Sequence, residues 1–470
     1  MSPQLTVDFS ANHSSAGLTL YFDTATEDYC SSLNIKWYDA AESLLADGNF
    51  QPTDAVYFCE KQVENYRKIV ITFFRTVKPY RYLKLSNILY GEIKTFSPDE
   101  IISANVREAV NPLSAELVIN TLGFRVHSND ARFNIMQPTG VYRLLQQLQP
   151  LKVWLNAGNS QKPMGVYYLE EWENDTENTV KISAVDALGI LDKTSFKGGM
   201  YSGVTVSTLV GMIALSGGVD YELEPALADI TLSGWLAICT HREALQQVAF
   251  AIGAVVSCSH SGVINIYRPA TEVATTISYE RKLLGHKITL KPLVTGVEII
   301  AHNYSAGTEA VELFKGALTL GQHEILFKEP AHSLTVTGAT IASSGTNYAI
   351  VSVTVAGEIT INGKRYNDSM QLIGVYMPDL PAAEKQNILK IEEATLINTA
   401  NALAVAQRIY DYYQIRYSDE GNVLLVDEKA GDMVKLDSLY NQSIEGRIES
   451  LDINLTGGFV GKAVITGVVG

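Results

Sequence analysis

The chain has 470 residues, of which 46% are apolar and 19% are charged, and its formal net charge is −15. This length predicts roughly two to four domains, and the low charged fraction favours extensive buried surface. The acidic balance excludes a general nucleic-acid binder, because such a protein carries a basic domain or stripe.

The first residues, "MSPQLTVDFSANHSS", show no basic segment followed by an apolar one, so we expect no secretory signal. No apolar run is long enough to span a membrane, and we expect no membrane anchor. The cysteines form no CxxC pair, which argues against zinc and thioredoxin-like sites. We expect buried reduced thiols, with a Cys30–Cys59 bridge as the open alternative, at Cys30, Cys59, Cys239 and Cys258.

Residues 4–92 are rich in β-branched and aromatic residues between turn formers, which predicts short strands. The expected strands are 17–23, 32–39, 55–60, 68–74 and 81–91. The stretch 78–91, "KPYRYLKLSNILYG", interleaves basic residues with tyrosines, as single-stranded nucleic-acid grooves do. Strand alternation instead places Leu83 and Leu85 on a buried face and Tyr82 and Lys84 on a wet one. We favour this second interpretation.

Residues 93–192 predict strands around one helix, 139–150, which Pro150 ends. Residues 193–280 are more helical. One helix ends at the glycines of "VSTLVGMIALSGG", and another opens with a capping box from Thr240 to Glu243 and ends at Gly253.

Residues 281–470 return to strands, interrupted by the clearest helix of the chain, 398–416. The predicted apolar stripe of this helix is Ala402, Leu403, Ala406, Ile409, Tyr410 and Tyr413. The segments "NPLSAELVI" (111–119) and "KPLVTGVEII" (291–300) echo each other at Pro112 and Pro292. We hold a duplicated domain as a hypothesis.

The sequence contains no complete motif that would bring reactive side chains together. His323 and Glu324 begin an HExxH motif that Phe327 breaks, and the eight histidines show no metal-ligand spacing. The capping box already accounts for Glu243 beside His241. The glycine-rich stretch 196–203, "FKGGMYSG", lacks the GK[ST] ending of a phosphate-binding loop.

Carboxylates and aromatic residues give no stronger signal. Glu170 and Glu171 are adjacent, so on a strand they point to opposite faces. Trp37, Tyr38 and Trp172 are of the type that stacks on sugars, but aromatic residues on strands more often belong to the core. We therefore assign no catalytic, cofactor-binding or metal-binding residue, and we expect a structural or binding protein without a cofactor.

Three N-terminal segments, "DYCSSLNIKWYD", "AVYFCEKQVENYRKIVITF" and "KPYRYLKLSNILYG", resemble the galactose-binding-like β-sandwich modules of tail proteins from phages and prophages of Gram-positive bacteria. The remainder is similar to the baseplate hub proteins that cap the tail tube. The similar segments are "NPLSAELVIN", "FNIMQPTGVYRLLQQLQPLKVWL", "MGVYYLEEWE", "ISAVDALGILDKTSFKGGMY", "REALQQVAFAIGAVV" and much of the chain from "IYDYYQIRYSDEG" onward.

The resemblance implies a mainly β fold with α+β parts. Its divisions are an N-terminal β-sandwich (1–92), a first tube-like β-barrel (93–192), a helical α+β middle domain (193–280) and a second barrel (281–470) with inserted strands and the helix 398–416. It further implies a homotrimer whose six barrels form a pseudo-sixfold ring on the tail tube.

By this resemblance the protein is a non-enzymatic hub of the virion tail baseplate, made in the bacterial cytoplasm. It joins the tail tube to the tip or spike and forms a channel for the ejected genome. The implied partners are other copies of the chain, the tail tube or distal tail protein, the tip or spike protein and the tape measure protein, with DNA only as passing cargo.

Two other functions stay open. One is an adhesin for host cell-wall glycan with residues 4–92 as its lectin, although that module would serve equally as a docking collar for baseplate proteins. The other is a cell-wall hydrolase built from carboxylates that no motif reveals.

Overall fold

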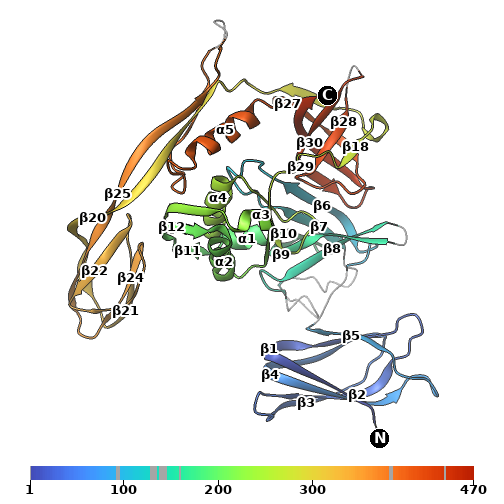
Figure 1. Ribbon diagram of the computed structural model, residues 1–470. Coiled ribbons are helices and arrows are strands. Elements are labelled where there is room, and N and C mark those ends of the chain that lie inside the picture. Colours follow the sequence, from blue (N-terminus) through green and yellow to red (C-terminus); the bar gives the residue numbers. More distant parts are fainter. Residues whose placement is uncertain are drawn as a thin grey trace. The chain divides into compact units, whose positions relative to one another are not determined.

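The computed structural model describes residues 2–91, 96–127, 135–136, 145–157, 160–380, 385–438 and 441–470. Most of the described residues lie in strands, as the sequence predicts (Figure 1). The chain divides into an N-terminal unit, Met1–Ser97 with Arg132–Leu145, and a large unit, Pro98–Ala131 with Gln146–Gly470. The finer division into four domains stays a prediction. None of the described helices is both long and apolar enough to cross a membrane.

The N-terminal unit is a five-stranded antiparallel sheet with strand order β3-β2-β4-β1-β5. Its strands are β1 (Gln4–Phe22), β2 (Cys30–Tyr38), β3 (Leu44–Phe50), β4 (Val56–Thr76) and β5 (Leu85–Tyr90). Alternate apolar side chains of β1, β2 and β4 form its core, with Trp37 fully buried. The all-β character is as predicted, whereas the galactose-binding-like sandwich stays a prediction.

The segment 78–91 is strand only from Leu85 onward, so the predicted strand begins four residues too early. Arg81 instead donates two hydrogen bonds, of 3.0 and 2.9 Å, to the buried carboxylate of Asp28, and Lys84 lies 3.0 Å from the same group. These bonds, that of Arg81 first, lower the pKa of Asp28. The positive charge of Arg81 and Lys84 is therefore balanced within the unit, which favours a folding role over a nucleic-acid contact.

The large unit contains an eleven-stranded sheet. The strands of its first half-sheet are β6 (Ile101–Ala109), β7 (Thr121–His127), β8 (Pro150–Ala157), β9 (Ser160–Thr176) and β10 (Thr179–Val185). Those of its second half-sheet are β19 (Lys287–Leu290), β27 (Tyr417–Leu424), β28 (Met433–Asp437), β29 (Ser443–Asn454) and β30 (Val460–Val469). The short strand β18 (Thr275–Ile277) pairs with β28.

The two half-sheets have the same topology. In each, the five strands in chain order lie in the spatial order first, second, fifth, fourth, third, and all neighbours are antiparallel. Each fourth strand also carries a bulge at a glutamate, Glu170 in β9 and Glu449 in β29. The structure therefore supports the duplication suggested by the echo at Pro112 and Pro292.

The half-sheets join where β29 pairs with β6, over Ser450–Asn454 and Asn105–Ala109. We call this pairing the internal seam. In the second half-sheet, a bridge between Lys282 and Val423 brings the chain after β18 beside β27. No sheet closes fully within the described residues, so the two barrels stay predictions.

Between the half-sheets the chain forms short strands and helices. They are α1 (Ala187–Asp192), β11 (Ser195–Phe196), β12 (Gly199–Thr205), α2 (Val206–Gly217), β13 (Tyr221–Leu223), α3 (Pro225–Ala228), β14 (Thr231–Leu236), β15 (Cys239–Thr240), α4 (His241–Ile252), β16 (Val255–Ser257), β17 (Ile264–Tyr267) and the 3-10 turn η2 (Tyr279–Arg281). As predicted, the capping box at Thr240 begins α4, and the left-handed glycines Gly218 and Gly253 end α2 and α4.

Two helix predictions need correction. Residues 139–144 of the expected helix 139–150 lie outside the described residues, while residues 145–149 form no helix and Pro150 begins β8. The helix expected over 398–416 is α5 (Ala402–Tyr413). Its buried face includes Val405, whereas Leu403 from the predicted stripe points to solvent, because Ala402, Val405 and Ile409 pack into the core.

An arm is inserted between the first and second strands of the second half-sheet (Figure 1). Its strands are β20 (Gly296–Leu318), β21 (Gly321–Leu326), β22 (Ala331–Thr337), β23 (Thr340–Ser344), β24 (Tyr348–Val353), β25 (Gly357–Tyr376) and β26 (Ile388–Ile391). The long strands β20 and β25 form an antiparallel ribbon, and the shorter strands enclose a small core that includes Phe327, Val351 and Ile361.

Asn347 fastens the arm to the middle of the large unit. Its buried side chain accepts a 2.8 Å hydrogen bond from Trp235 Nε1 and donates 2.8 Å bonds to the carbonyls of Lys197 and Leu236. A buried polar group without its partner costs free energy. One side chain therefore satisfies three groups of the middle region at the same time.

We predict that Asn347→Ala lowers the free energy of unfolding by about 2 kcal/mol, because it leaves these buried groups unpaired. Urea unfolding followed by circular dichroism measures the change. The exposed Asn367 of β25 is a matched control, and Asn367→Ala should leave stability within about 0.5 kcal/mol of the wild type. Equal losses in both variants would show that Asn347 has no anchoring role.

Candidate functional site

His241 and Glu243, which are close together in the sequence, have structural roles. The His241 ring is buried, with Nδ1 2.8 Å from Thr194 Oγ1 and Nε2 2.9 Å from Ser216 Oγ. Glu243 completes the capping box of α4, as predicted. Both ring nitrogens are engaged within the fold, so His241 presents no free base.

The other sequence candidates do not converge. His323 Nε2 donates a 2.8 Å hydrogen bond to the carbonyl of Thr319, while Glu324 pairs with Lys197. Trp37 lies in the core, as the more usual interpretation of a strand aromatic predicts. Within the described parts of the chain, no three His, Cys, Asp or Glu side chains are placed to hold a metal ion.

The four cysteines are free, so Cys30 and Cys59 form no disulfide. Burial raises the pKa of the Cys30 thiol to about 11 and that of the Cys59 thiol to about 12. Cys258 is also buried, whereas Cys239 is partly exposed. Thiols with raised pKa values are poor nucleophiles at neutral pH, which fits a packing role.

The most unusual chemical group lies at the internal seam. Glu108 of β6 is fully buried and faces inward with its neighbours Ala104 and Val106. His260 Nε2 lies 3.6 Å from Glu108 Oε1. Neither carboxylate oxygen of Glu108 nor Nε2 of His260 has a hydrogen-bond partner of normal geometry among the described residues.

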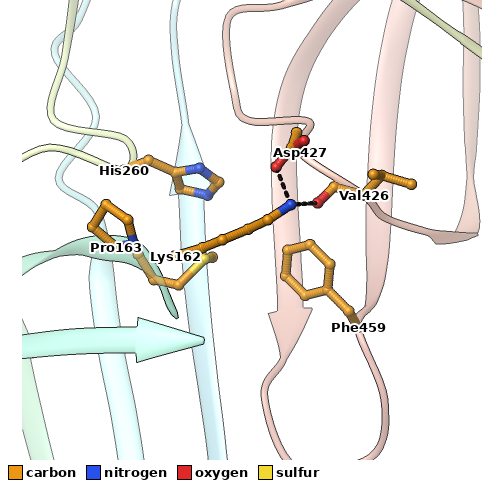
Figure 2. A pocket seen from close by; sticks show the side chains of 7 residues that line it. Lys162, Pro163, His260, Val426, Asp427 and Phe459 are labelled. Carbon is orange, nitrogen blue, oxygen red and sulfur yellow. Dashed lines mark hydrogen bonds and ion pairs between the residues drawn. The ribbon is translucent and has the colours of Figure 1, made fainter. Parts of the chain in front are cut away.

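Two small cavities lie beside this pair and share His260 and Pro163 in their walls. The larger, of about 250 Å³, lies between β9 and the C-terminal strands. Figure 2 shows Lys162 extending across it to Asp427 and to the carbonyl of Val426, with His260 on the wall. The positive end of Lys162 is thus held by Asp427 rather than by Glu108.

Burial controls the protonation of the pair. It raises the pKa of Glu108 to about 7, against the opposing effect of nearby groups that include the amide of Ala430 and the hydroxyl of Ser259. Burial also lowers the pKa of His260 to about 4. The neutral forms are favoured because a buried charge without a partner is costly.

The pair can bind and release a proton inside the fold. The nearby Ser259 hydroxyl has no hydrogen-bond partner of normal geometry among the described residues. Glu108 was not predicted from the sequence, although the alternation of "ANVREA" places it on the apolar face of a strand. A charged residue on the apolar face of a strand is unusual, and this pattern could have identified Glu108 as a candidate.

No protein-family model and no curated protein matches the chain. Several solved structures are similar to the chain. The 43 kDa tail protein of prophage MuSo2 from Shewanella oneidensis has a TM-score of 0.46 at 12% identity, covering 81% of this chain and 94% of its own. The tail protein from Neisseria meningitidis MC58 has a TM-score of 0.47 at 10% identity, covering 78% and 92%.

Prophage tail protein gp18 from Listeria monocytogenes EGD-e is also similar, with a TM-score of 0.44 at 9% identity, covering 93% of this chain and 94% of its own. All three neighbours are described as tail proteins, and two of them as proteins of a prophage. At such scores the likeness is partial, and it does not by itself assign a function to this chain.

We predict that Glu108 makes the protein less stable as pH rises from about 4.5 to about 7. In this range the unfolded chain releases the Glu108 proton while the native protein keeps it, so raising the pH favours unfolding. Above pH 7 the full loss in the free energy of unfolding is reached, and the shift in the pKa of Glu108 makes this loss on the order of 3 kcal/mol. Glu108→Gln, which stays neutral, should remove this dependence.

Urea unfolding at pH 5 and pH 8 tests the prediction. The difference in stability between the two pH values should be smaller in Glu108→Gln than in the wild type. Glu116→Gln, at an exposed position of the same half-sheet region, should behave as the wild type. Parallel pH profiles for Glu108→Gln and the wild type would contradict the neutral Glu108.

Proposed function

We propose that this protein is a structural, non-enzymatic component of a phage or phage-like tail. Its role is that of the baseplate hub, which joins the tail tube to the tip or spike and surrounds a channel for the genome. The proposal begins from the sequence resemblance to hub proteins, which runs through most of the chain.

The observation that carries the proposal is the duplicated strand order of the two half-sheets. A symmetric tube of six identical units needs an adaptor with two similar units per chain if that adaptor is a trimer. One chain here supplies two five-stranded units of the same topology, joined side by side at the internal seam. Three chains therefore supply the six units of a pseudo-sixfold ring.

The charge of the chain suits such a channel. With a net charge of −15, the protein repels phosphate, so a lumen lined by it lets DNA pass without retaining it. The expected partners are the tail tube or distal tail protein on one face of the ring, the tip or spike protein on the other, and the tape measure protein. The protein would act in the virion tail after synthesis in the bacterial cytoplasm.

We predict that purified full-length protein forms threefold rings with a central hole. Each chain uses two similar but non-identical units, so the outline should be nearly sixfold while the true symmetry is threefold. Class averages from negative-stain electron microscopy at micromolar concentration measure this directly. Compact particles without symmetry, both alone and with the tail tube protein added, would contradict the hub assignment.

One observation favours a second candidate function, binding of cell-wall glycan by the N-terminal unit. Tyr80 and Tyr82 are almost fully exposed, and the backbone of Tyr80 has φ of 59°. Arg81 between them is held by Asp28, which fixes the segment. Exposed tyrosine rings next to a held backbone segment are suited to stacking on a ligand.

If this second function holds, Tyr80→Ala/Tyr82→Ala should weaken binding to purified Gram-positive cell-wall polysaccharide at least tenfold, a loss of about 1.4 kcal/mol. Isothermal titration calorimetry on the full chain measures the affinity. Tyr279→Ala, at another exposed tyrosine, should bind as the wild type does. An unchanged affinity in the double variant, or no binding by the wild type, would leave the unit as a docking collar.

A further inference from the structure

In the internal seam, the fourth strand of the second half-sheet, β29, pairs with the first strand of the first half-sheet, β6. The converse pairing would join the fourth strand of the first half-sheet, β9, to the first strand of the second, β19. This pairing is not made among the strands that the structure describes. Beyond Glu170, no described strand occupies the outer edge of β9 at Glu171 and Trp172, and β19 has β27 as its single described partner.

The duplicated ladders define which residues correspond. A row of facing residues crosses four strands in each half-sheet. In the first half-sheet the row is Val106, Leu122, Ala184 and Leu169. In the second half-sheet it is Ile288, Asp419, Ile465 and Ile448. In both rows the next residue of the fourth strand is the bulged glutamate, Glu170 or Glu449.

Because the rows identify corresponding positions in the two half-sheets, the register of the internal seam can be applied to the open edges of β9 and β19. Leu451 faces Glu108 in the internal seam. The corresponding positions are Trp172 of β9 and Leu290 of β19. The same register sets Glu171 opposite Lys291 across the edges.

The chemistry of the two edges is complementary at these positions. Leu290 and Ile288 are exposed on β19, where a large apolar side chain gains free energy by burial against Trp172. Glu171 is exposed and acidic, and Lys291, which already lies 3.4 Å from Glu449 of its own chain, adds positive charge on the facing edge. Opposite charges on facing strands are favourable.

An exposed strand edge with apolar side chains is normally covered or blocked, because it pairs with other chains. We infer that β19 of one copy pairs antiparallel with the outer edge of β9 of a second copy, in the register that sets Leu290 against Trp172. The contact surfaces differ, so each copy offers one free edge to the next, and the assembly closes as a ring when successive rotations return to the first copy. The number of copies in that ring, three, rests on the proposed function.

Cysteine cross-linking tests the register. Facing residues of an antiparallel pair have Cα atoms about 4.5–5.5 Å apart, which is within the reach of a disulfide. Trp172→Cys/Leu290→Cys should give covalent multimers of the full-length protein under mild oxidation, ending at a closed trimer. Each single variant controls for the native thiols, and Trp172→Cys/Leu320→Cys, with its second cysteine on the arm, should not cross-link.

A charge substitution gives an independent readout. Leu290→Glu places a carboxylate against Trp172 and should weaken self-association at least tenfold in analytical ultracentrifugation. Leu320→Glu is the matched control, since Leu320 is 65% exposed and Leu290 54% exposed, and it should associate as the wild type does. Circular dichroism verifies that each variant is folded, and if Trp172→Cys unfolds the chain the Leu290→Glu result decides.

The outcomes separate this inference from the proposed function. One outcome is that threefold rings form without the Trp172–Leu290 cross-link and persist in Leu290→Glu. That result overturns the β19–β9 contact and leaves the hub assignment intact. Cross-linked multimers that close at a number of copies other than three support the contact and overturn the trimeric hub. Monomers at every concentration, both alone and with the tail tube protein added, and with no cross-link, overturn both.

Discussion

The fold of the large unit depends on one short ladder, the pairing of Ser450–Asn454 with Asn105–Ala109. Without it, β6 and β29 would each present an open edge, and side-chain packing such as that of Met164 against the core of the second half-sheet would have to hold the two units together. The ladder also buries Glu108, whose neutral form avoids placing a lone charge at this junction. Backbone pairing thus sets the geometry of the two units, and the environment that it creates sets the protonation of a side chain.

Local signals in the sequence predicted local structure well. The capping box at Thr240 and the glycine at Gly253 bound α4 as expected, because both act within one turn of the helix. The strands expected at 55–60 and 68–74 are instead one strand, β4, although polar residues separate them. There the pairing with β1 across a bulged region overrides the local composition.

Features that depend on contacts between distant segments could not be predicted from the sequence. The echo at Pro112 and Pro292 suggested a duplication, but the shared strand order depends on pairings between distant residues, such as Lys287 with Glu420. The approach of His260 to Glu108 has the same origin, since a turn after β16 and a strand edge meet only in the folded chain. Likewise, Asn347 is an ordinary loop residue in the sequence and a buried anchor in the structure.

The wide separation of β6 and β29 along the chain has a consequence for biosynthesis. Strand β6 leaves the ribosome more than 300 residues before β29 does, and contacts between such distant segments form slowly. During that interval the edge of β6 that β29 later covers is open to pairing with any other strand. We therefore expect the first half-sheet to be the part of the nascent chain that most needs protection from aggregation.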